Sequence, residues 1–295
     1  MKSVLTLLFV TSMVIVAGNT AFSQKLKAEE VVAKHLESVG TAEQRAAIKN
    51  RIAVGTVVVT FRSPNTGTAP GRFVMASEGE KHLMGMMFDG VPNYPQEKVG
   101  YDGKNVSVSY VRPGKRSTLG DLFAQYSSMV SQGLVGGSIS AAWPLYHIEN
   151  SKAKLEYAGM KKAGDKQAHV LKYLKGGTDL EVSFYFDAET FQHIRTEYTR
   201  TIAAQQGGVS SPSQSANQRD QAINSSARQR ESRYRIVEDF GDFRKEGDLT
   251  LPHKYKILVE VTLPGGSYKA DWEAILSQFG FNQDIDPKSF DVEAN

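Results

Sequence analysis

The stretch from Arg235 to Ile257, RIVEDFGDFRKEGDLTLPHKYKI, decides the fold class of this chain. Apolar residues alternate with polar ones on both sides of a turn, Lys245-Glu246-Gly247-Asp248. Alternation around a glycine-containing turn predicts a β-hairpin. The alternating residues are Tyr234, Ile236, Val237, Phe240, Phe243, Leu249, Leu251, Tyr255, Ile257 and Val259.

Strand patterns of the same kind occupy most of the chain. They give about eleven or twelve strands in up-and-down order, which predicts one strongly curved antiparallel sheet. The chain has 295 residues, and all-β domains reach this size undivided. The other strand-like segments are 56–61, 71–77, 82–88, 106–111, 155–161, 168–174, 180–186, 191–199 and 267–275.

Helical periodicity is confined to two regions. An amphipathic helix is expected over residues 27–50, with a break at Gly40. Apolar residues at three- and four-residue intervals predict a central helix over 119–134, and a short helix over 138–143 is expected to end at Pro144. The fold class is therefore mainly β with α, and the sheet must cover the apolar stripe of the central helix.

Three segments of this chain resemble the hairpins of one protein family. The first is FYFDAETF, residues 184–191, and the second is YDGKN, residues 101–105, followed by Tyr110 and Pro113. Together with the hairpin around the Gly247 turn, they resemble the hairpins of the LolA/LolB-like outer-membrane lipoprotein-sorting proteins, which are periplasmic lipoprotein carriers.

This resemblance implies a fold and a function. The fold is a single highly curved antiparallel sheet, a half-open β-barrel of about 11 strands, with helices across its concave face. In the family this cavity carries the acyl chains of a lipoprotein across the periplasm. The family also has an arginine that contacts the helical lid, and Arg72 is the candidate here.

The N-terminus has the pattern of a secretory signal peptide. Lys2 provides a positive charge, an apolar run follows from Val4 to Ala17, and Ala21-Phe22-Ser23 offers a cleavage site. We expect residues 1–23 to be removed near Ser23, leaving 24–295 as a single LolA-like half-barrel domain in the periplasm. The alternative is an uncleaved membrane anchor, although the run is shorter than the ~20 residues of a membrane span. The chain has no cysteine, so it has neither a lipidation site nor disulfides.

Residues 203–231 differ in composition from the rest of the chain. They are rich in Gln, Ser, Asn, Ala, Gly and Arg and contain almost no aliphatic side chains. Such a segment buries too little apolar surface to offset its ordering entropy, which predicts a flexible polar loop. A partner-binding arm that orders on contact is the alternative, because long loops in compact domains are often functional.

The sequence contains no pattern typical of catalysis or metal binding. The six histidines lack metal-ligand spacing, so surface or turn positions are expected for them. No G-x-S-x-G frame or phosphate-binding glycine loop is present. Solvated strand faces are expected for the carboxylate pairs Asp179/Glu181, Asp187/Glu189 and Glu238/Asp239, rather than a catalytic dyad. We therefore expect no catalytic residue, no metal, no cofactor and no enzyme activity.

Residues 83–88 are apolar at nearly every position. Such a strand is covered on both faces or uses one face to bind a ligand. Methionine suits a surface that must fit varied acyl chains, while ordinary core packing is the alternative. Met84, Met86 and Phe88 are expected to face the central helix, or a neighbouring strand that carries Phe184 and Phe186. The predicted apolar cavity is lined by Met84, Met86, Phe88, Leu122, Phe123, Tyr126, Met129, Phe184 and Phe186.

The favoured function is a periplasmic binding or carrier protein for lipidated or other apolar ligands. The alternative is a non-catalytic structural or interaction protein of the envelope, whose own helix fills the cavity. The expected partners are acyl chains of a lipoprotein or lipid, envelope proteins and, transiently, the membrane. We expect a monomer that binds no nucleic acid, because 35 basic residues are scattered among 32 acidic ones rather than clustered on one face.

Overall fold

A computed structural model of the protein describes residues 26–177, 179–203 and 231–293. The predicted signal peptide and nearly all of the predicted polar loop, residues 203–231, lie outside these ranges. In the part of the chain that is described, no helix is long and apolar enough to cross a membrane.

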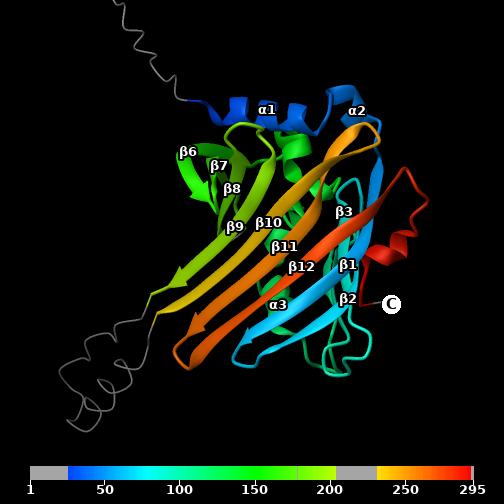
Figure 1. Cartoon of the computed structure of the whole chain (residues 1–295), viewed down its shortest axis with the longest axis vertical. Coiled ribbons are helices and arrows are strands. Elements are labelled where there is room, and N and C mark those ends of the chain that lie inside the picture. Colours follow the sequence, from blue (N-terminus) through cyan, green and yellow to red (C-terminus); the bar gives the residue numbers. More distant parts are fainter. Residues whose placement is uncertain (1–25, 178, 204–230, 294–295) are drawn as a thin grey trace, which may run out of the picture.

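Twelve strands form one antiparallel sheet that curves strongly and stays open (Figure 1). Their order is β5-β4-β3-β2-β1-β12-β11-β10-β9-β8-β7-β6. The prediction of a mainly β half-barrel is confirmed, and the twelve strands lie within the expected eleven or twelve. The strands are β1 (Asn50–Ser63), β2 (Gly67–Glu78), β3 (Lys81–Met87), β4 (Gln96–Tyr101), β5 (Val106–Val108), β6 (Lys154–Ala163), β7 (Lys166–Leu174), β8 (Glu181–Asp187), β9 (His193–Ile202), β10 (Ser232–Glu246), β11 (Leu249–Leu263) and β12 (Gly266–Phe281).

The hairpin predicted first is β10 with β11. Phe240 is the cross-strand partner of Tyr255, and Ile236 is the partner of Val259. Gly247 in the turn has a φ of 57°, in the left-handed region that favours glycine. Apolar alternation and turn chemistry therefore identified this hairpin correctly.

The helices are short, and two of them differ from the prediction. The central helix is divided at Tyr126, whose φ of −107° and ψ of 46° are not helical. The segment expected to end at Pro144 contains only one 3₁₀ turn, and Pro144 begins a helix instead, because its missing N–H needs no partner in a first turn. The helices are α1 (Ala28–Val39), α2 (Ala42–Ala46), α3 (Thr118–Gln125), α4 (Ser127–Ser131) and the 3₁₀ helices η1 (Gly137–Ile139), η2 (Pro144–Asn150) and η3 (Pro287–Phe290).

Residues 118–150, here named the plug, lie inside the curve of the sheet (Figure 1). Leu119, Leu134, Ile139 and Trp143 of the plug are at most 1% exposed and join the same apolar core as the inward side chains of the strands. The chain thus fills the concave face of its own sheet. Helix α1 lies across one end of the half-barrel and buries Val31 against the same core.

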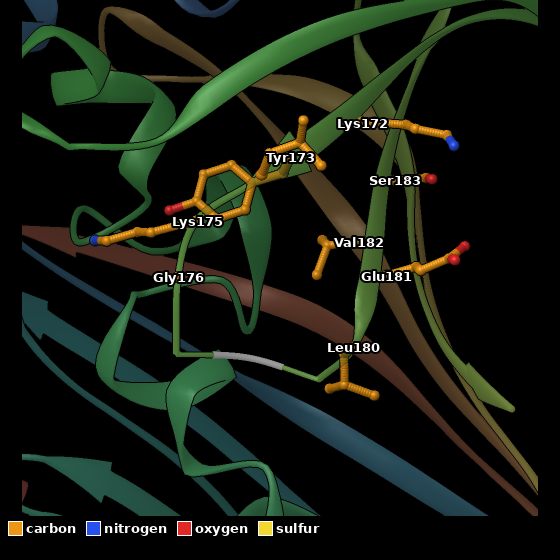
Figure 2. Close-up of a pocket in the computed structure, with 9 residues that line it drawn as sticks. Lys172, Tyr173, Lys175, Gly176, Leu180, Glu181, Val182 and Ser183 are labelled. Carbon is orange, nitrogen blue, oxygen red and sulfur yellow. The ribbon is translucent and has the colours of Figure 1, made fainter. Parts of the chain in front are cut away.

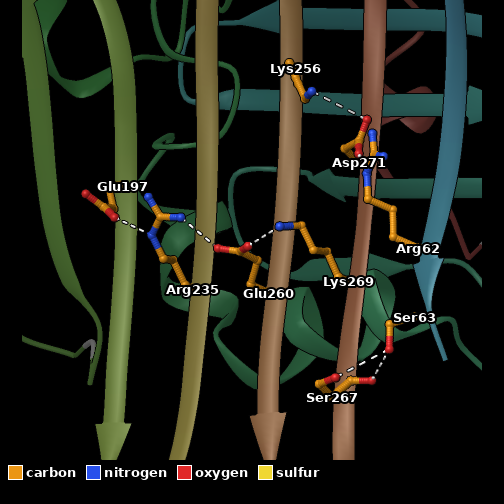
Figure 3. Close-up of polar contacts among 9 residues, drawn as sticks. All are labelled: Arg62, Ser63, Glu197, Arg235, Lys256, Glu260, Ser267, Lys269 and Asp271. Carbon is orange, nitrogen blue, oxygen red and sulfur yellow. Dashed lines mark hydrogen bonds and ion pairs between the residues drawn. The ribbon is translucent and has the colours of Figure 1, made fainter. Parts of the chain in front are cut away.

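The outer face of the sheet carries rows of alternating charge that run across the strands (Figure 3). In one row, Glu197 on β9 pairs with Arg235 on β10 at 2.6 Å, and Arg235 pairs with Glu260 on β11 at 2.7 Å. Lys269 on β12 completes the row at 2.7 Å from Glu260. Opposite charges on adjacent strands favour this register over a slipped one. A second group on this face joins Asp271 to Arg62 and Lys256.

The two edges of the sheet differ. At β5, the Val108 N–H donates to Oε1 of Glu293 at 3.4 Å, and its carbonyl accepts from Nε of Arg116 at 3.1 Å. Arg116 and Glu293 also form an ion pair at 2.8 Å, so side chains close this edge. In the described part of the chain β6 pairs only with β7, and its exposed residues include Lys161 and Lys162. Lysines on an edge strand discourage pairing with another sheet.

The register of β9 and β10 generates a prediction about residues 204–230, which connect them. Ile202 and Ser232 are cross-strand partners, so the strand ends already lie side by side. Replacing 204–230 with a short Gly-Ser turn should therefore shift the melting temperature by less than about 3 °C, since loop length changes closure entropy only slowly. The measurement is thermal unfolding followed by circular dichroism, and a much lower melting temperature would contradict the expected dispensability of this segment.

Candidate functional site

The predicted cavity wall on β3 is buried. Met84, Met86 and Phe88 are 2%, 1% and 1% exposed, and they lie on one face of the strand at the predicted period of two. The Met84 sulfur lies 3.9 Å from the Tyr255 hydroxyl. On the opposite face Gly85 is buried, whereas the side chains of Leu83 and Met87 are half-buried, so that face is only partly covered.

The predicted residues of the central helix join the same core. Leu122 and Phe123 on α3, Tyr126 between the helices and Met129 on α4 are each at most 4% exposed. Helices α3 and α4 both contact β4 and β5, beside β3. The methionine wall of β3 and the apolar stripe of the plug thus belong to one core, and the plug helices contact the two strands that follow β3.

Phe184 and Phe186 lie elsewhere in the same core. Strand β8, which carries them, is not a neighbour of β3, because β2, β1, β12, β11, β10 and β9 lie between the two. Phe184 packs edge-on against Trp143, with ring centroids 5.7 Å apart, and Phe186 lies 4.9 Å from His35. The expectation of adjacent strands was wrong, since sequence patterns do not show how far a sheet curves. That these residues contact a ligand stays a prediction.

A buried carboxylate fastens the middle of the plug to the sheet. Glu238 on β10 is 1% exposed and accepts the Gly136 N–H at 2.8 Å. The Tyr198 hydroxyl donates to Glu238 at 2.7 Å, and the Tyr255 hydroxyl donates to its other oxygen. Tyr198 also lies within 3.1 Å of the Leu134 carbonyl. Burial raises the pKa of Glu238, and these hydrogen bonds oppose that rise.

The expected solvated position of Glu238 was therefore wrong. Glu238 has the same strand parity as Ile236 and Phe240, both of which are buried. The alternation of the sequence therefore already indicated an inward, buried position for Glu238. Its partners Tyr198 and Tyr255 lie on the two neighbouring strands, and only the register of the sheet reveals that they meet.

An arginine also contacts the plug, but it is not Arg72. Arg72 is on the outside, where its side chain is 65% exposed and pairs with Asp89. Arg51 on β1 is 4% exposed and donates to the carbonyls of Ser138 at 2.6 Å and Ile139 at 3.1 Å. Arg72 therefore does not contact the plug, whereas Arg51 does.

The expectation of surface histidines was also wrong, since only His147 is exposed. His35 on α1 and His193 on β9 are fully buried beside Trp143, which stacks on His193 with ring centroids 4.5 Å apart. Burial lowers the pKa of His35 to about 4 and that of His193 well below its usual range. Both rings are therefore neutral near neutral pH and serve the packing of α1 against the plug.

A second buried carboxylate lies where the plug begins. The Tyr94 hydroxyl donates to Glu97 on β4 at 2.6 Å and accepts from Nε1 of Trp272 at 2.9 Å. Burial raises the pKa of Glu97 to about 7, opposed by hydrogen bonds from Ser117 and Tyr94. Ser117 is also the N-cap of α3, where its hydroxyl accepts from Gly120 N at 2.9 Å. Glu97 therefore fastens the start of α3 to the sheet.

Helices α3 and α4, residues 118–131 and here named the arch, lie between these two fastenings. Its inward residues are apolar, and Leu119 and Val130 are not exposed at all. Gly133, directly after the arch, has a φ of 67° and packs against the Ala142 carbonyl. Gly136 has a φ of 83° and packs against the side chain of Met75. These left-handed glycines allow the chain to turn sharply where the arch meets the middle of the plug.

Shallow pockets open on the surface around this core. One of about 430 Å³ lies between the ends of β7 and β8, and Figure 2 shows Tyr173 and Val182 at it. Lys172, Glu181 and Ser183 point to the other side of the strands, whereas the side chain of Lys175 lies on the same side as the Tyr173 ring. Within the described residues no three His, Asp or Glu side chains could together hold a metal ion.

No protein-family model matches the chain, and no curated protein matches it. Among solved structures it is similar to a LolA superfamily protein from Nitrosomonas europaea, with 12% identity, a TM-score of 0.46, and coverage of 92% of this chain and 100% of that one. A putative outer membrane lipoprotein-sorting protein domain from Vibrio parahaemolyticus is 11% identical with a TM-score of 0.42, over 89% of this chain and 98% of that one. A DUF1329 family protein from Desulfovibrio piger is 7% identical with a TM-score of 0.39, over 90% of this chain and 98% of that one.

The first two of these structures are described as LolA-superfamily and lipoprotein-sorting proteins, the family whose hairpins this sequence resembles. The class of protein is an open β half-barrel with an internal plug. At these identities and TM-scores, function has to be inferred from the contacts of this chain.

The Glu238 cluster generates a stability prediction. Changing Glu238 to Leu leaves the Gly136 N–H and the Tyr255 hydroxyl without an acceptor and should cost about 4 kcal/mol of unfolding free energy. Changing Glu238 to Gln keeps an acceptor for both, and Tyr198 can donate to Leu134 instead, so the cost should stay near 1 kcal/mol. Urea unfolding measures both variants, and equal losses would show that the hydrogen bonds do not hold the plug.

Glu97 generates a prediction about pH. Its pKa is about 7 in the folded protein against an ordinary value of 4.5, so the unfolded chain loses its proton first as the pH rises. Between these two pKa values Glu97 makes the protein less stable with increasing pH, by about 3 kcal/mol in total. Urea unfolding of the parent and of Glu97→Gln, from about pH 5 to pH 8, isolates this contribution. The stability of the parent relative to the variant should fall until about pH 7 and then level off, and a constant difference would contradict the prediction.

Proposed function

We propose that the protein binds the acyl chain of a lipoprotein or lipid beneath the arch and carries it through the periplasm. The observation that supports this is the division of the plug. Its middle is fastened to the sheet by Glu238 and Arg51, whereas the arch contacts β4 and β5 and shares an apolar core with Met84 and Met86. An acyl chain would replace one set of apolar contacts with another and leave the middle in place.

The energetics favour such an exchange. Each methylene that leaves water gains about 0.8 kcal/mol, so a partly sheltered acyl chain already binds measurably. Methionine side chains adapt to ligands of different shape, and Met84 and Met86 of β3 share the core with Met129 of the arch. Gly133 and Gly136 supply a hinge at one end of the arch.

The N-terminal pattern indicates the cellular compartment in which this protein would act. A chain that is exported behind residues 1–23 meets lipidated proteins in the periplasm, and it contacts a membrane only while it takes up or releases its ligand. We propose a monomeric carrier without a catalytic role. Envelope proteins would be its partners during loading and release.

A second function is supported by a separate observation. Every residue of the predicted cavity is at most 4% exposed, so the chain already fills its own concave face. An envelope protein that serves as a rigid interaction module would have the same packing. The two functions differ in whether the arch opens.

A disulfide between α3 and β5 tests this difference. A Cβ atom built on Gly120 would lie 3.4 Å from Cγ1 of Val108, the atom whose place a cysteine sulfur can take, so the two positions are close enough for a disulfide to be tested. The native chain has no cysteine, so Val108→Cys with Gly120→Cys gives a single possible bridge. We expect the oxidised protein to lose at least about 90% of its acyl binding and the reduced protein to keep it, because the bridge holds the arch on the sheet.

Binding is measured by native mass spectrometry after incubation with a lipopeptide, and by organic extraction of the purified protein. The single variants Val108→Cys and Gly120→Cys serve as matched controls for the two substitutions. If the oxidised and the reduced protein bound the lipopeptide equally well, the proposal that the arch opens to admit the acyl chain would be wrong. Absence of acyl ligands from the native protein in both measurements would favour the interaction module.

A further inference from the structure

A pocket of about 430 Å³ lies at the end of the half-barrel opposite α1. Strand β1 runs from α2, beside that helix, to this far end, where Phe61 and Pro64 form one side of the pocket (Figure 1). Tyr94 and Tyr268 form another side, and Ser117 and Thr118 at the start of α3 complete it. Its volume lies within the ~300–1,000 Å³ of small-molecule sites.

Aromatic rings connect this pocket to the methionine wall. Phe61 packs edge-on against Tyr94, with ring centroids 5.1 Å apart, and Phe88 lies at the same distance on Tyr94. Phe88 follows Met86 and Met84 on the same face of β3. An apolar chain that passes Tyr94 would therefore meet the wall proposed above to bind acyl groups.

The Tyr94 side chain separates the pocket from the core, because it lies between Phe61 and Phe88. Its ring is 8% exposed, and its hydroxyl is held from two sides by Glu97 and Trp272. Both partners are buried and belong to the sheet rather than to the arch. The loop that carries Tyr94 can thus change its conformation while the sheet holds Glu97 and Trp272 in place.

The charges at the pocket indicate which end of a ligand stays outside. Lys115 and Arg116 line the rim, with Asp121 as the acidic residue of the lining. Arg116 is engaged by Glu293 and lies over the Tyr110 ring, 4.2 Å from its centroid. Within the described residues no ion pair engages the exposed ammonium group of Lys115, which leaves it available to an anion.

We infer that this pocket is the entry site for a single-chain amphiphile with an anionic head, which enters tail first past Tyr94 and leaves its head beside Lys115. This inference rests on the proposed function, because the tail would end on the methionine wall. A fatty acid anion has this chemistry, and so does the acyl end of a lipid with an acidic head.

The two tryptophans of the chain provide the test. The Trp272 indole N–H is hydrogen-bonded to Tyr94 at the pocket, whereas Trp143 lies among His35 and His193 near α1. On adding laurate to ¹⁵N-labelled protein, the indole signal of Trp272 should shift with ligand concentration, and that of Trp143 should stay in place. Dodecanol, which has a neutral head on a tail of equal length, serves as the matched ligand.

Substitution of Lys115 separates the contribution of the ligand's head to binding from that of its tail. Lys115→Gln should weaken laurate binding about threefold, as expected for an exposed ion pair, and leave dodecanol binding unchanged. Lys161→Gln, on the distant strand β6, is the matched control and should change neither. Equal weakening of both ligands by Lys115→Gln would overturn the assignment of the head.

The outcomes separate this site from the proposed function. If laurate binds by calorimetry and shifts Trp143 alone, the entry site is overturned and acyl binding stands. If neither laurate nor dodecanol binds, both the entry site and acyl binding are overturned. A Trp272 shift that needs about threefold more laurate in Lys115→Gln than in the parent, and an unchanged amount of dodecanol, supports the inference.

Discussion

The Glu238 carboxylate accepts hydrogen bonds from the plug and from both neighbouring strands of the sheet, at a point that is 1% exposed. An open curved sheet presents an apolar concave face that something must cover. Here the cover is a segment of short helices and turns, which has many backbone groups without partners of its own. Glu238 and Arg51 satisfy several of these groups inside the core. The plug can therefore be irregular and still be buried, because the sheet supplies the hydrogen bonds that a longer helix would make within itself.

Local patterns predicted the local structure well. The hairpin at Gly247 follows from alternation and turn chemistry. The expected up-and-down order holds within β1–β5 and within β6–β12, but β1 pairs with β12, and β5 and β6 lie at opposite edges of the sheet. Long-range neighbours were not predictable in the same way. The expected adjacency of Phe184 to the β3 wall failed because it depends on where the sheet curves, and the burial of His193 depends on a plug residue, Trp143, that is distant in sequence.

The candidate site combines a predicted and an unpredicted part. The apolar residues from Met84 to Met129 were identified from period and composition, and they do share one core. The groups that position the plug were missed, since Glu97 and Glu238 are carboxylates on strands that otherwise expose their charges. A buried charge is stable only with suitable partners, and those partners come from other strands. Sequence patterns therefore located the apolar wall but not the contacts that hold its cover.

The unequal edges of the sheet limit how copies of this chain could join. At β5 the Arg116–Glu293 pair occupies the outward groups of Val108, which hinders the addition of a strand from a second molecule there. Head-to-tail stacking of sheets needs both edges, and this molecule offers one. Contact between two β6 strands would be two-fold symmetric and would stop at a dimer, with Lys161 and Lys162 of the two copies repelling each other. A capped edge thus hinders an open sheet from growing into a fibre by strand addition.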